Sequence, residues 1–253
     1  MSRVSVIIQS HDRPNGLKRA LQSLQMQTFK GFEVLISDDS ASEADIRDVV
    51  SGPAAAGLDI DMRHTAPCGA AESMREAFGR SSCEYIKVLH DDDWLTPHSL
   101  EQQVAALDTN PDSNVVYGHA LISYRERDQL AYVFEDKPVK IPSARWVASY
   151  ESNGGGPIQS PVTALYRRHE RFRIVWDEYV NPTLREAARK TGAGTDINLH
   201  VDNAGSNEYV VLLSRVVCFL GTDMDSVTQT DPKILSYYAM WKQEYDTHPP
   251  WRY

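Results

Sequence analysis

Strand-like and helix-like segments alternate along the first hundred residues, and this alternation constrains the fold more than any other feature of the chain. Short apolar runs rich in β-branched residues predict strands at 4–8, 32–37, 60–64 and 84–89. Apolar residues at helical spacing predict helices at 17–24, 44–50 and 69–79. Because strands separated by helices pair side by side in parallel, we expect an α/β domain with a parallel sheet flanked by helices.

Polar residues gather where three of these strands end. The clusters are residues 10–13, Asp38 with Asp39, and residues 91–93. Ligands of an open α/β sheet bind beyond the carboxyl ends of its strands. We therefore expect the three clusters to share one crevice, and this shared placement is a stronger argument than any one cluster.

Three consecutive aspartates, Asp91 to Asp93, follow the last of these strands. Side chains alternate along an extended segment, so we expect Asp91 and Asp93 to point one way and Asp92 the other. Crowded carboxylates stay ionised more easily around a cation, and Mg²⁺ or Mn²⁺ favours oxygen ligands and bridges to diphosphate oxygens. The alternative is an acidic turn before a helix that Asp93 or Thr96 caps.

The length of 253 residues suits one large α/β domain, or one domain with a modest C-terminal extension. The second half is less regular than the first. Strands are expected at 114–123 and 162–166, and a long apolar run follows at 210–220. The chain then ends in a segment rich in tyrosine and tryptophan.

The composition favours a soluble, cytoplasmic protein. Three cysteines cannot all pair and none are at CxxC spacing, so a reducing compartment fits better than a disulfide framework. No apolar run is long enough for a signal peptide or a membrane span. The net charge of −9 would repel nucleic acid, and the arginines between 167 and 173 form either a local basic patch or an ordinary solvated surface.

Taken in order, these motifs resemble those of a family 2 glycosyltransferase of the GT-A fold. The family's opening strand and Pro-Thr-Tyr-Asn-Arg motif are similar to residues 4–14, and Gln27-Thr28 follows the expected helix. Its Val-Asp-Asp-Gly-Ser motif is similar to residues 37–42, and its aspartate motif to residues 89–97. Gly69 matches the family's Asn-x-Gly helix start, and residues 84–86 match its Glu-Tyr-Ile strand. The resemblance continues more weakly in residues 160–167, 194–196 and 225–228.

Three positions depart from the family pattern. His90 stands where the first aspartate of the metal motif is expected, so the metal ligand should be one of the last two aspartates of the triplet. Met74 takes the place of an arginine in the family pattern, and Arg75 follows it, so the arginine is displaced by one position. Gln9 replaces the opening proline.

The resemblance implies a single Rossmann-like, nucleotide-binding α/β domain with a mixed, mostly parallel central sheet. The GT-A domain would span residues 1–230, with a nucleotide-sugar-binding half at 1–100 and an acceptor-binding half at 101–230. An aromatic-rich C-terminal tail would follow at 231–253.

The resemblance also implies a donor site for a nucleotide-diphosphate sugar, assisted by Mn²⁺ or Mg²⁺. The residues expected to bind base and ribose are Ser10, His11, Asp38 and Asp39, whose oxygen and nitrogen atoms suit these polar groups. The residues expected to complete the donor site are Arg13, Arg75, Asp91 and Asp92. The expected metal ligands are Asp93, Asp92, Asp91 and Asp223, the last of which fits a surface turn equally well.

Members of this family invert the anomeric centre, which requires a carboxylate to take the acceptor proton. Asp196 matches the family's late acidic motif and is the expected general base. Asp202 and Glu208 are weaker candidates. The alternative for Asp196 is a cap at the start of a helix.

The acceptor is not identified by the sequence and could be a glycan, a lipid-linked molecule or a small molecule. It should lie against the second half, including the loop at 154–160 and the aromatic tail, although the same aromatic residues could pack on the domain or form a homodimer. A non-catalytic nucleotide-sugar-binding module and a nucleotidyltransferase are the alternative functions. The latter usually has a glycine-rich phosphate loop, whereas the first turn here holds only Gly16.

Overall fold

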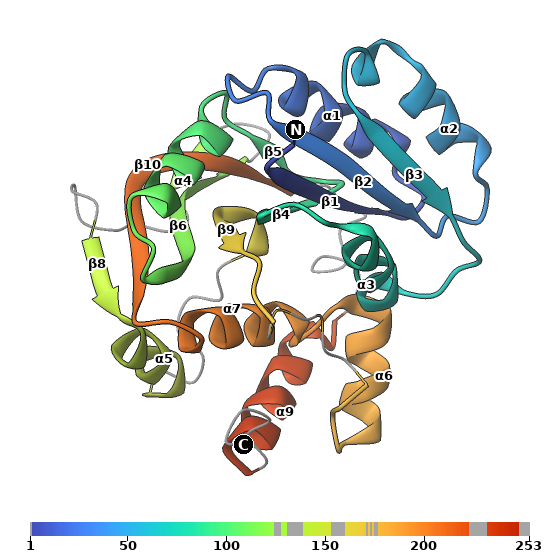
Figure 1. Ribbon diagram of the computed structural model, residues 1–253. Helices are drawn as coiled ribbons and strands as arrows, with labels where there is room; N and C mark the ends of the chain where they lie inside the picture. Colours follow the sequence, from blue (N-terminus) through green and yellow to red (C-terminus); the bar gives the residue numbers. More distant parts are fainter. Residues whose placement is uncertain are drawn as a thin grey trace.

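The computed structural model describes residues 2–123, 128–130, 139–152, 160–170, 172, 174, 177–222 and 232–247. Across these residues, ten strands form one sheet in the order β3-β2-β1-β4-β9-β6-β10-β5, with β7 on β6 and β8 on β10 (Figure 1). The strands are β1 Val4–Ser10, β2 Phe32–Asp38, β3 Ile60–His64, β4 Tyr85–His90, β5 Trp94–Leu95, β6 Ser113–Ser123, β7 Asp128–Leu130, β8 Val139–Pro142, β9 Ala164–Arg167 and β10 Tyr209–Gly221. The helices are α1 Pro14–Gln25, α2 Ala44–Ser51, α3 Ala70–Arg80, α4 Ser99–Asp108, α5 Ser143–Ser152, α6 Pro182–Thr191, α7 Thr195–Gly205 and α9 Ile234–Thr247, with 3₁₀ turns η1 Pro53–Ala55 and η2 Pro161–Thr163.

The N-terminal part of the sheet is parallel, as predicted. β3, β2, β1 and β4 pair in parallel, and helices cover both faces (Figure 1). Val6 and Ile8 of β1 belong to the same core as Leu17 of α1, whereas Ile7 belongs to the second core with Met74 of α3. Because both faces of β1, β2 and β4 are buried, these three strands are apolar along most of their length and carry polar groups mainly at their ends. The edge strand β3 is more exposed and more polar.

The second half of the sheet mixes directions. β9 is antiparallel to its neighbours β4 and β6, whereas β10 is parallel to β6 and antiparallel to β5 and β8. β10 has 13 residues and shifts register against β6 more than once. It bends around the molecule (Figure 1), and its last residue, Gly221, reaches the turn that follows β4. The predicted mixed central sheet is confirmed.

The strand predicted at 162–166 starts later than expected. Ser160 accepts a hydrogen bond from the Val162 backbone N–H, and Pro161 occupies the first position of the 3₁₀ turn η2. Proline is favoured there because its ring fixes φ and its missing N–H needs no partner. The strand β9 therefore begins at Ala164.

A lysine is enclosed at the centre of the fold. Lys87 of β4 has no exposed surface, and its Nζ donates to Gln103 Oε1 at 2.8 Å, Val162 O at 2.6 Å and Ala164 O at 3.0 Å. Burial lowers the pKa of Lys87 to about 7, because the interior disfavours the charged amine. The amine ties β4 to α4 and to the η2–β9 segment.

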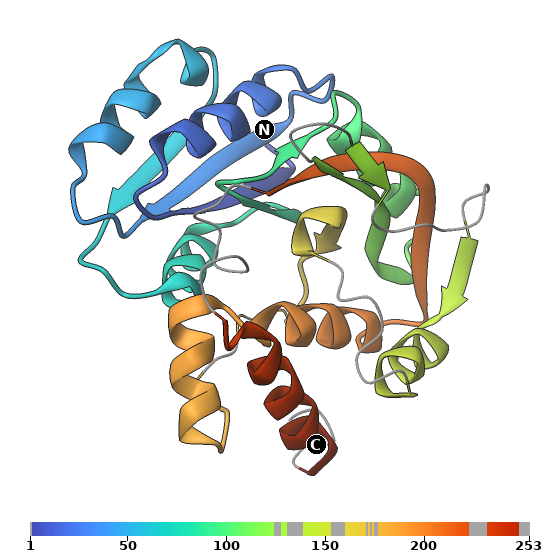
Figure 2. The same cartoon turned by 180° about the vertical axis from the view of Figure 1, so that it is seen from behind.

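Helices α6, α7 and α9 lie on the side of the sheet away from α1 and α2, as both views show (Figures 1 and 2). The segment expected to be an aromatic tail therefore includes a helix that packs on the domain, and Trp241 of α9 is only 3% exposed. No helix in the described part of the chain combines the length and apolar character that a bilayer span requires.

Candidate active site

A cavity of about 800 Å³ lies between the carboxyl ends of β1 and β4 on one side and α6, α7 and α9 on the other. It brings together most of the residues that the sequence singled out. The predicted site residues that line it are Ser10, His11, Arg13, Asp39, Asp91, Asp92, Asp93 and Asp196. The expectation that the polar strand ends share one crevice is therefore confirmed for these residues.

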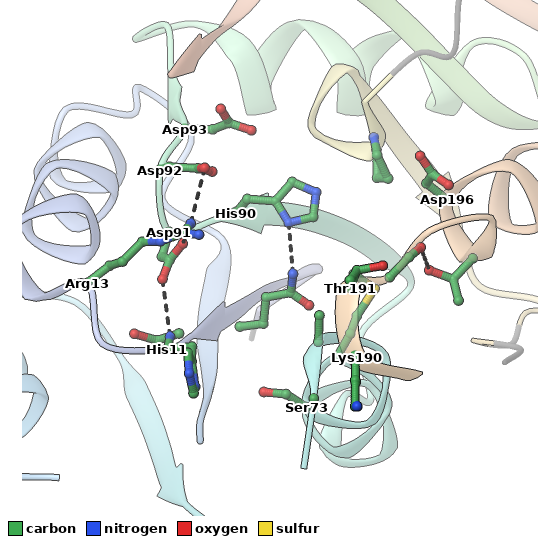
Figure 3. A pocket seen from close by; sticks show the side chains of 18 of the residues that line it. His11, Arg13, Ser73, His90, Asp91, Asp92, Asp93, Lys190, Thr191 and Asp196 are labelled. Carbon is green, nitrogen blue, oxygen red and sulfur yellow. Dashed lines mark hydrogen bonds and ion pairs between the residues drawn. The ribbon is translucent and has the colours of Figure 1, made fainter. Parts of the chain in front are cut away.

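The aspartate triplet forms a turn rather than an extended segment. β4 ends at His90, and the Asp93 backbone N–H donates to His90 O at 3.1 Å. Arg13 Nη1 lies 2.9 Å from Asp91 Oδ1 and 3.1 Å from Asp92 Oδ2, so one guanidinium holds both carboxylates (Figure 3). Asp93 instead accepts from the Gly221 backbone N–H at 2.8 Å. The predicted alternation of these side chains is wrong, because the chain turns where the prediction assumed a strand.

The aspartates of this turn are crowded and largely removed from water. Burial raises the pKa of Asp91 to about 7, although the positive charge of Arg13 opposes the shift. Burial and then the negative charge of Asp92 raise the pKa of Asp93 well above the ordinary aspartate value. Positive charge placed among these groups would therefore favour their ionised forms.

Two glycines allow other segments to approach the backbone of this turn. A Cβ at Gly16 of α1 would lie 2.4 Å from Asp91 O, and a Cβ at Gly221 of β10 would lie 2.1 Å from Asp92 O. Both distances are too short for a side chain without movement of the turn. The helix and the strand therefore hold the turn from two directions.

Gly221→Ala is expected to displace the aspartate turn, because the added methyl group overlaps Asp92 O. Overpacking of this kind costs about 1–3 kcal/mol of unfolding free energy, and the same movement should weaken donor binding. The matched control is Gly79→Ala in α3, where no atom lies within 4 Å of the added Cβ. A helical Gly→Ala change at such a site stabilises by about 0.4–1 kcal/mol. Denaturant unfolding measures both values, and equal effects of the two substitutions would contradict the steric argument.

On the opposite flank of the turn, His11 and Asp39 connect β1 with β2. The His11 backbone N–H donates to Asp91 Oδ2 at 3.3 Å, and the Nδ1 atom of the His11 ring lies 3.1 Å from Asp39 Oδ1. Asp39 Oδ2 accepts from the backbone N–H groups of Cys68 at 3.0 Å and Gly69 at 2.9 Å. Asp39 therefore fixes the loop before α3, and the half-exposed His11 ring is available at the cavity wall.

Two predicted donor-binding residues do not line the cavity. Asp38 is fully buried and its carboxylate is bonded to His64 Nδ1 at 2.7 Å and to the Ser40 hydroxyl, so it holds the end of β2. Arg75 pairs with Asp177 at 2.9 Å and with Glu72 at 2.6 Å on the outer side of α3. Their positions do not support direct contact with a ligand in this cavity.

Basic residues at the end of α6 line the cavity instead, and the sequence analysis did not identify them. Lys190 lines the cavity, but its amine points away from the aspartate turn (Figure 3) and pairs with Glu186 at 3.1 Å. Arg189 donates to Cys68 O at 2.6 Å. The helix begins with an Asn181 cap and Pro182, and it ends at Gly192, whose φ is +76°. An asparagine cap, a first-turn proline and a terminal glycine are recognisable helix signals, so α6 was predictable although its role was not.

The two departures from the family pattern at Gln9 and His90 meet in space. These residues are neighbours in the β1–β4 register, and Gln9 Nε2 lies 3.2 Å from His90 Nδ1. Burial lowers the pKa of His90, which favours a neutral imidazole at the floor of the cavity. A neutral, hydrogen-bonded ring thus occupies the place where the family pattern has an aspartate.

Asp196 lies across the cavity from the aspartate turn (Figure 3). It is the second residue of α7, whose cap position is Gly194, so it lies in the first helical turn and is not the cap. Its Oδ1 accepts from the Ile197 N–H at 2.9 Å and its Oδ2 from the Tyr238 hydroxyl at 2.9 Å. Burial raises the pKa of Asp196 to about 6, and the bond from Tyr238 opposes this shift.

The remaining predicted residues are placed elsewhere. Asp202 and Glu208, the weaker candidates for the base, do not line the cavity. Asp223 and the loop residues 153–159 lie outside the described residues. Within the described residues, no three His, Cys, Asp or Glu side chains are grouped so that they could hold a metal ion.

Comparison with known proteins identifies the family. The model of glycosyl transferase family 2 matches residues 5–170, which include most of β1, the aspartate turn and β9. The chain belongs to glycosyl transferase family 2. Asp196 and helix α9 lie beyond the segment that the family model matches.

Individual relatives in the family match only part of the chain. An uncharacterized glycosyltransferase of Haemophilus influenzae is 32% identical over 114 residues, which is 45% of this chain and 37% of that protein. A GalNAc(5)-diNAcBac-PP-undecaprenol β-1,3-glucosyltransferase of Campylobacter jejuni is 28% identical over 129 residues, which is 48% of this chain and 39% of that protein. The chain matches between 18% and 58% of the length of these and similar curated relatives.

Solved structures support the fold over nearly the whole chain. The crystal structure of S. aureus TarS 1–349 in complex with UDP-GlcNAc has a TM-score of 0.66, with 95% of this chain and 66% of that chain covered at 15% identity. The same TarS segment in complex with UDP gives a TM-score of 0.62 at 17% identity. At these identities the likeness shows the fold, which is the GT-A fold expected for the family.

Proposed function

We propose that the chain transfers a glycosyl group from a nucleotide-diphosphate sugar to an acceptor, with inversion of the anomeric carbon and Asp196 as general base. The observation that carries the proposal is the arrangement of the cavity. The polar ends of parallel strands line one side, and the partly buried carboxylate of Asp196, with a pKa of about 6, faces them from the other. Membership of glycosyl transferase family 2 supports the same class of reaction.

The donor nucleotide is proposed to bind against the ends of β1 and β2. Ser10 Oγ is buried at the cavity wall and has no hydrogen-bond partner among the described residues. A buried hydroxyl without a partner is costly, and a ligand at this wall would satisfy it. His11 and Asp39 lie beside it at the same wall of the cavity. UDP-GlcNAc is the first donor to test, because the TarS structure with the same fold contains it.

The aspartate turn suits a divalent cation in part, and Mn²⁺ or Mg²⁺ is part of the proposal. Asp91 uses both carboxylate oxygens, on Arg13 and on the His11 N–H, and is the least suited of the three. Asp92 and Asp93 each commit one oxygen, to Arg13 and to the Gly221 N–H, but Asp92 is the less buried of the two and is therefore the better-placed ligand. Mg²⁺ is commonly held by one or two carboxylates together with substrate phosphates. When bound, such a cation would stabilise the charge of the leaving diphosphate.

Asp196 is proposed to take the proton of the acceptor hydroxyl. The acceptor oxygen forms a bond to the anomeric carbon, the bond from that carbon to the diphosphate breaks, and the proton passes to the Asp196 carboxylate. A pKa of about 6 keeps most of this carboxylate ionised at neutral pH and leaves it basic enough to accept the proton. The position of Asp196 across from the aspartate turn supports this role, because a base for in-line attack is needed on the side opposite the leaving group.

A binding and turnover assay tests this function. A panel of nucleotide-sugars that includes UDP-GlcNAc would be screened by thermal shift with Mn²⁺ and with EDTA, because a bound ligand raises the unfolding temperature by mass action. Nucleotide release would then be measured with each donor that binds. We expect stabilisation and slow nucleotide release even with water as the acceptor. Stabilisation without nucleotide release from any donor, with or without added glycans, would favour a binding module over a transferase.

A further inference from the structure

Helix α9 contributes one face to the candidate active site. Ile234, Tyr238 and Trp241 are spaced four and three residues apart, which places them along one side of a helix. Ile234 and Tyr238 line the cavity, and Trp241 is buried behind them. The residues that the family model matches end before this helix begins.

Trp241 fixes α9 against the start of α7. Its Nε1 donates to Asn198 Oδ1 at 2.9 Å, and Asn198 Nδ2 donates to the Tyr179 hydroxyl at 2.7 Å. Gly194, which precedes α7 with a φ of +84°, has no room for a side chain, because a Cβ there would lie 2.7 Å from Trp241 Cδ1. Helix α9 therefore contacts the chain directly at Gly194, the residue just before helix α7, which carries Asp196.

The contact continues from Trp241 to the carboxylate itself. Tyr238, one helical turn before Trp241, donates its hydroxyl proton to Asp196 Oδ2 at 2.9 Å. The other oxygen, Oδ1, accepts from the Ile197 N–H at 2.9 Å. A carboxylate held through both oxygens has one preferred orientation, and the part of it that faces the cavity is set by these two bonds.

We propose that Tyr238 is a positioning residue for the general base, which holds the Asp196 carboxylate in the orientation that receives the acceptor proton, so that helix α9 completes the acceptor side of the site. This inference rests on the proposed role of Asp196. It assigns a role to a segment that the sequence alone indicated only as aromatic. In this arrangement the acceptor hydroxyl lies between the Asp196 carboxylate and the anomeric carbon of the donor.

Tyr238→Phe removes the hydroxyl and keeps the ring. A hydrogen bond to the charged form lowers the pKa of a carboxylate, so its loss should raise the pKa of Asp196 by about one unit. The acidic limb of the kcat profile should move to higher pH by the same amount, and kcat on that limb should fall about tenfold. KM for the donor should stay close to the wild-type value, because Tyr238 lies across the cavity from the strand ends.

The experiment measures nucleotide release from UDP-GlcNAc, with water as the acceptor, across the acidic and neutral pH range. The matched control is Tyr237→Phe, which removes a hydroxyl from the adjacent residue of the same helix that does not line the cavity. The control should follow the wild-type pH profile. Carbon-13 NMR titration of the Asp196 carboxyl, assigned by its absence in Asp196→Asn, gives the same comparison without any turnover.

The outcomes separate this inference from the proposed function. A wild-type pH profile and an unchanged Asp196 titration in Tyr238→Phe, alongside an inactive Asp196→Asn, would overturn the role of Tyr238 and leave the general base in place. Full activity of Asp196→Asn would overturn the base and the positioning role together. Equal losses in Tyr238→Phe and Tyr237→Phe would indicate that α9 acts through packing alone, which also overturns the inference.

Discussion

Asp196→Asn is expected to lower kcat by about 10²–10⁴-fold, the usual contribution of a general base. Asparagine keeps the shape of the side chain and an oxygen that can accept from Tyr238, but it cannot take a proton. Affinity for the nucleotide-sugar should change little, because the proposed donor-binding groups lie on the far side of the cavity. In the wild type the rate should rise with pH through about 6, as the carboxylate loses its proton, and this rise should disappear in the variant.

Steady-state kinetics with a direct binding measurement would check this expectation. Glu208→Gln is the matched control, since it removes an exposed carboxylate that does not line the cavity. A variant at Asp196 that folds and retains full activity would rule out its role as the base. A variant that loses donor affinity together with turnover would indicate that the carboxylate supports the structure of the site and is not the proton acceptor.

Asp92→Asn is expected to remove most of the metal-dependent donor affinity. Loss of an outer-shell partner commonly costs about 10–100-fold in metal affinity, so loss of a proposed direct ligand should cost at least about 100-fold. Calorimetric titration with UDP-GlcNAc in Mn²⁺ and in EDTA measures the effect. In the variant, EDTA should weaken binding no further.

Asp93→Asn provides the comparison for this second prediction. Its side-chain oxygen can still accept the hydrogen bond from the Gly221 N–H, so the geometry of the turn should persist. The loss of affinity should be smaller than for Asp92→Asn. A larger loss at Asp93 would identify Asp93 as the main metal ligand. Equal affinity with and without EDTA in the wild type would exclude a metal from donor binding.

The N-terminal half of the fold was predictable because its signals are local. Apolar β-branched runs and helical spacing within short windows correctly predicted β1, α1, β2, α2, β3, α3 and β4. The shared crevice followed from the same pattern, because the ends of parallel strands meet at one edge of the sheet. Ser10, His11 and Asp39 accordingly lie together at the cavity.

The conformation of the aspartate turn was not predictable from its own residues. Its direction depends on Gly16 and Gly221, which approach Asp91 and Asp92 from a helix and from the last strand. The bond between Tyr238 and Asp196 joins residues 42 positions apart, and no periodicity in the sequence connects them. Contacts of this kind appear only once the chain has folded, so the sequence could indicate Asp196 through its motif but could not show what holds it.

The rate at which Lys87 reacts with an added reagent can show how often the sheet opens. Its amine has no exposed surface and is held by three oxygen acceptors, and the burial that lowers its pKa to about 7 ends when the amine meets water. An amine-reactive reagent can therefore reach it only when β4 separates from α4 and the η2–β9 segment. The rate of acylation at this one position, read by mass spectrometry, measures how often the centre of the sheet opens under native conditions.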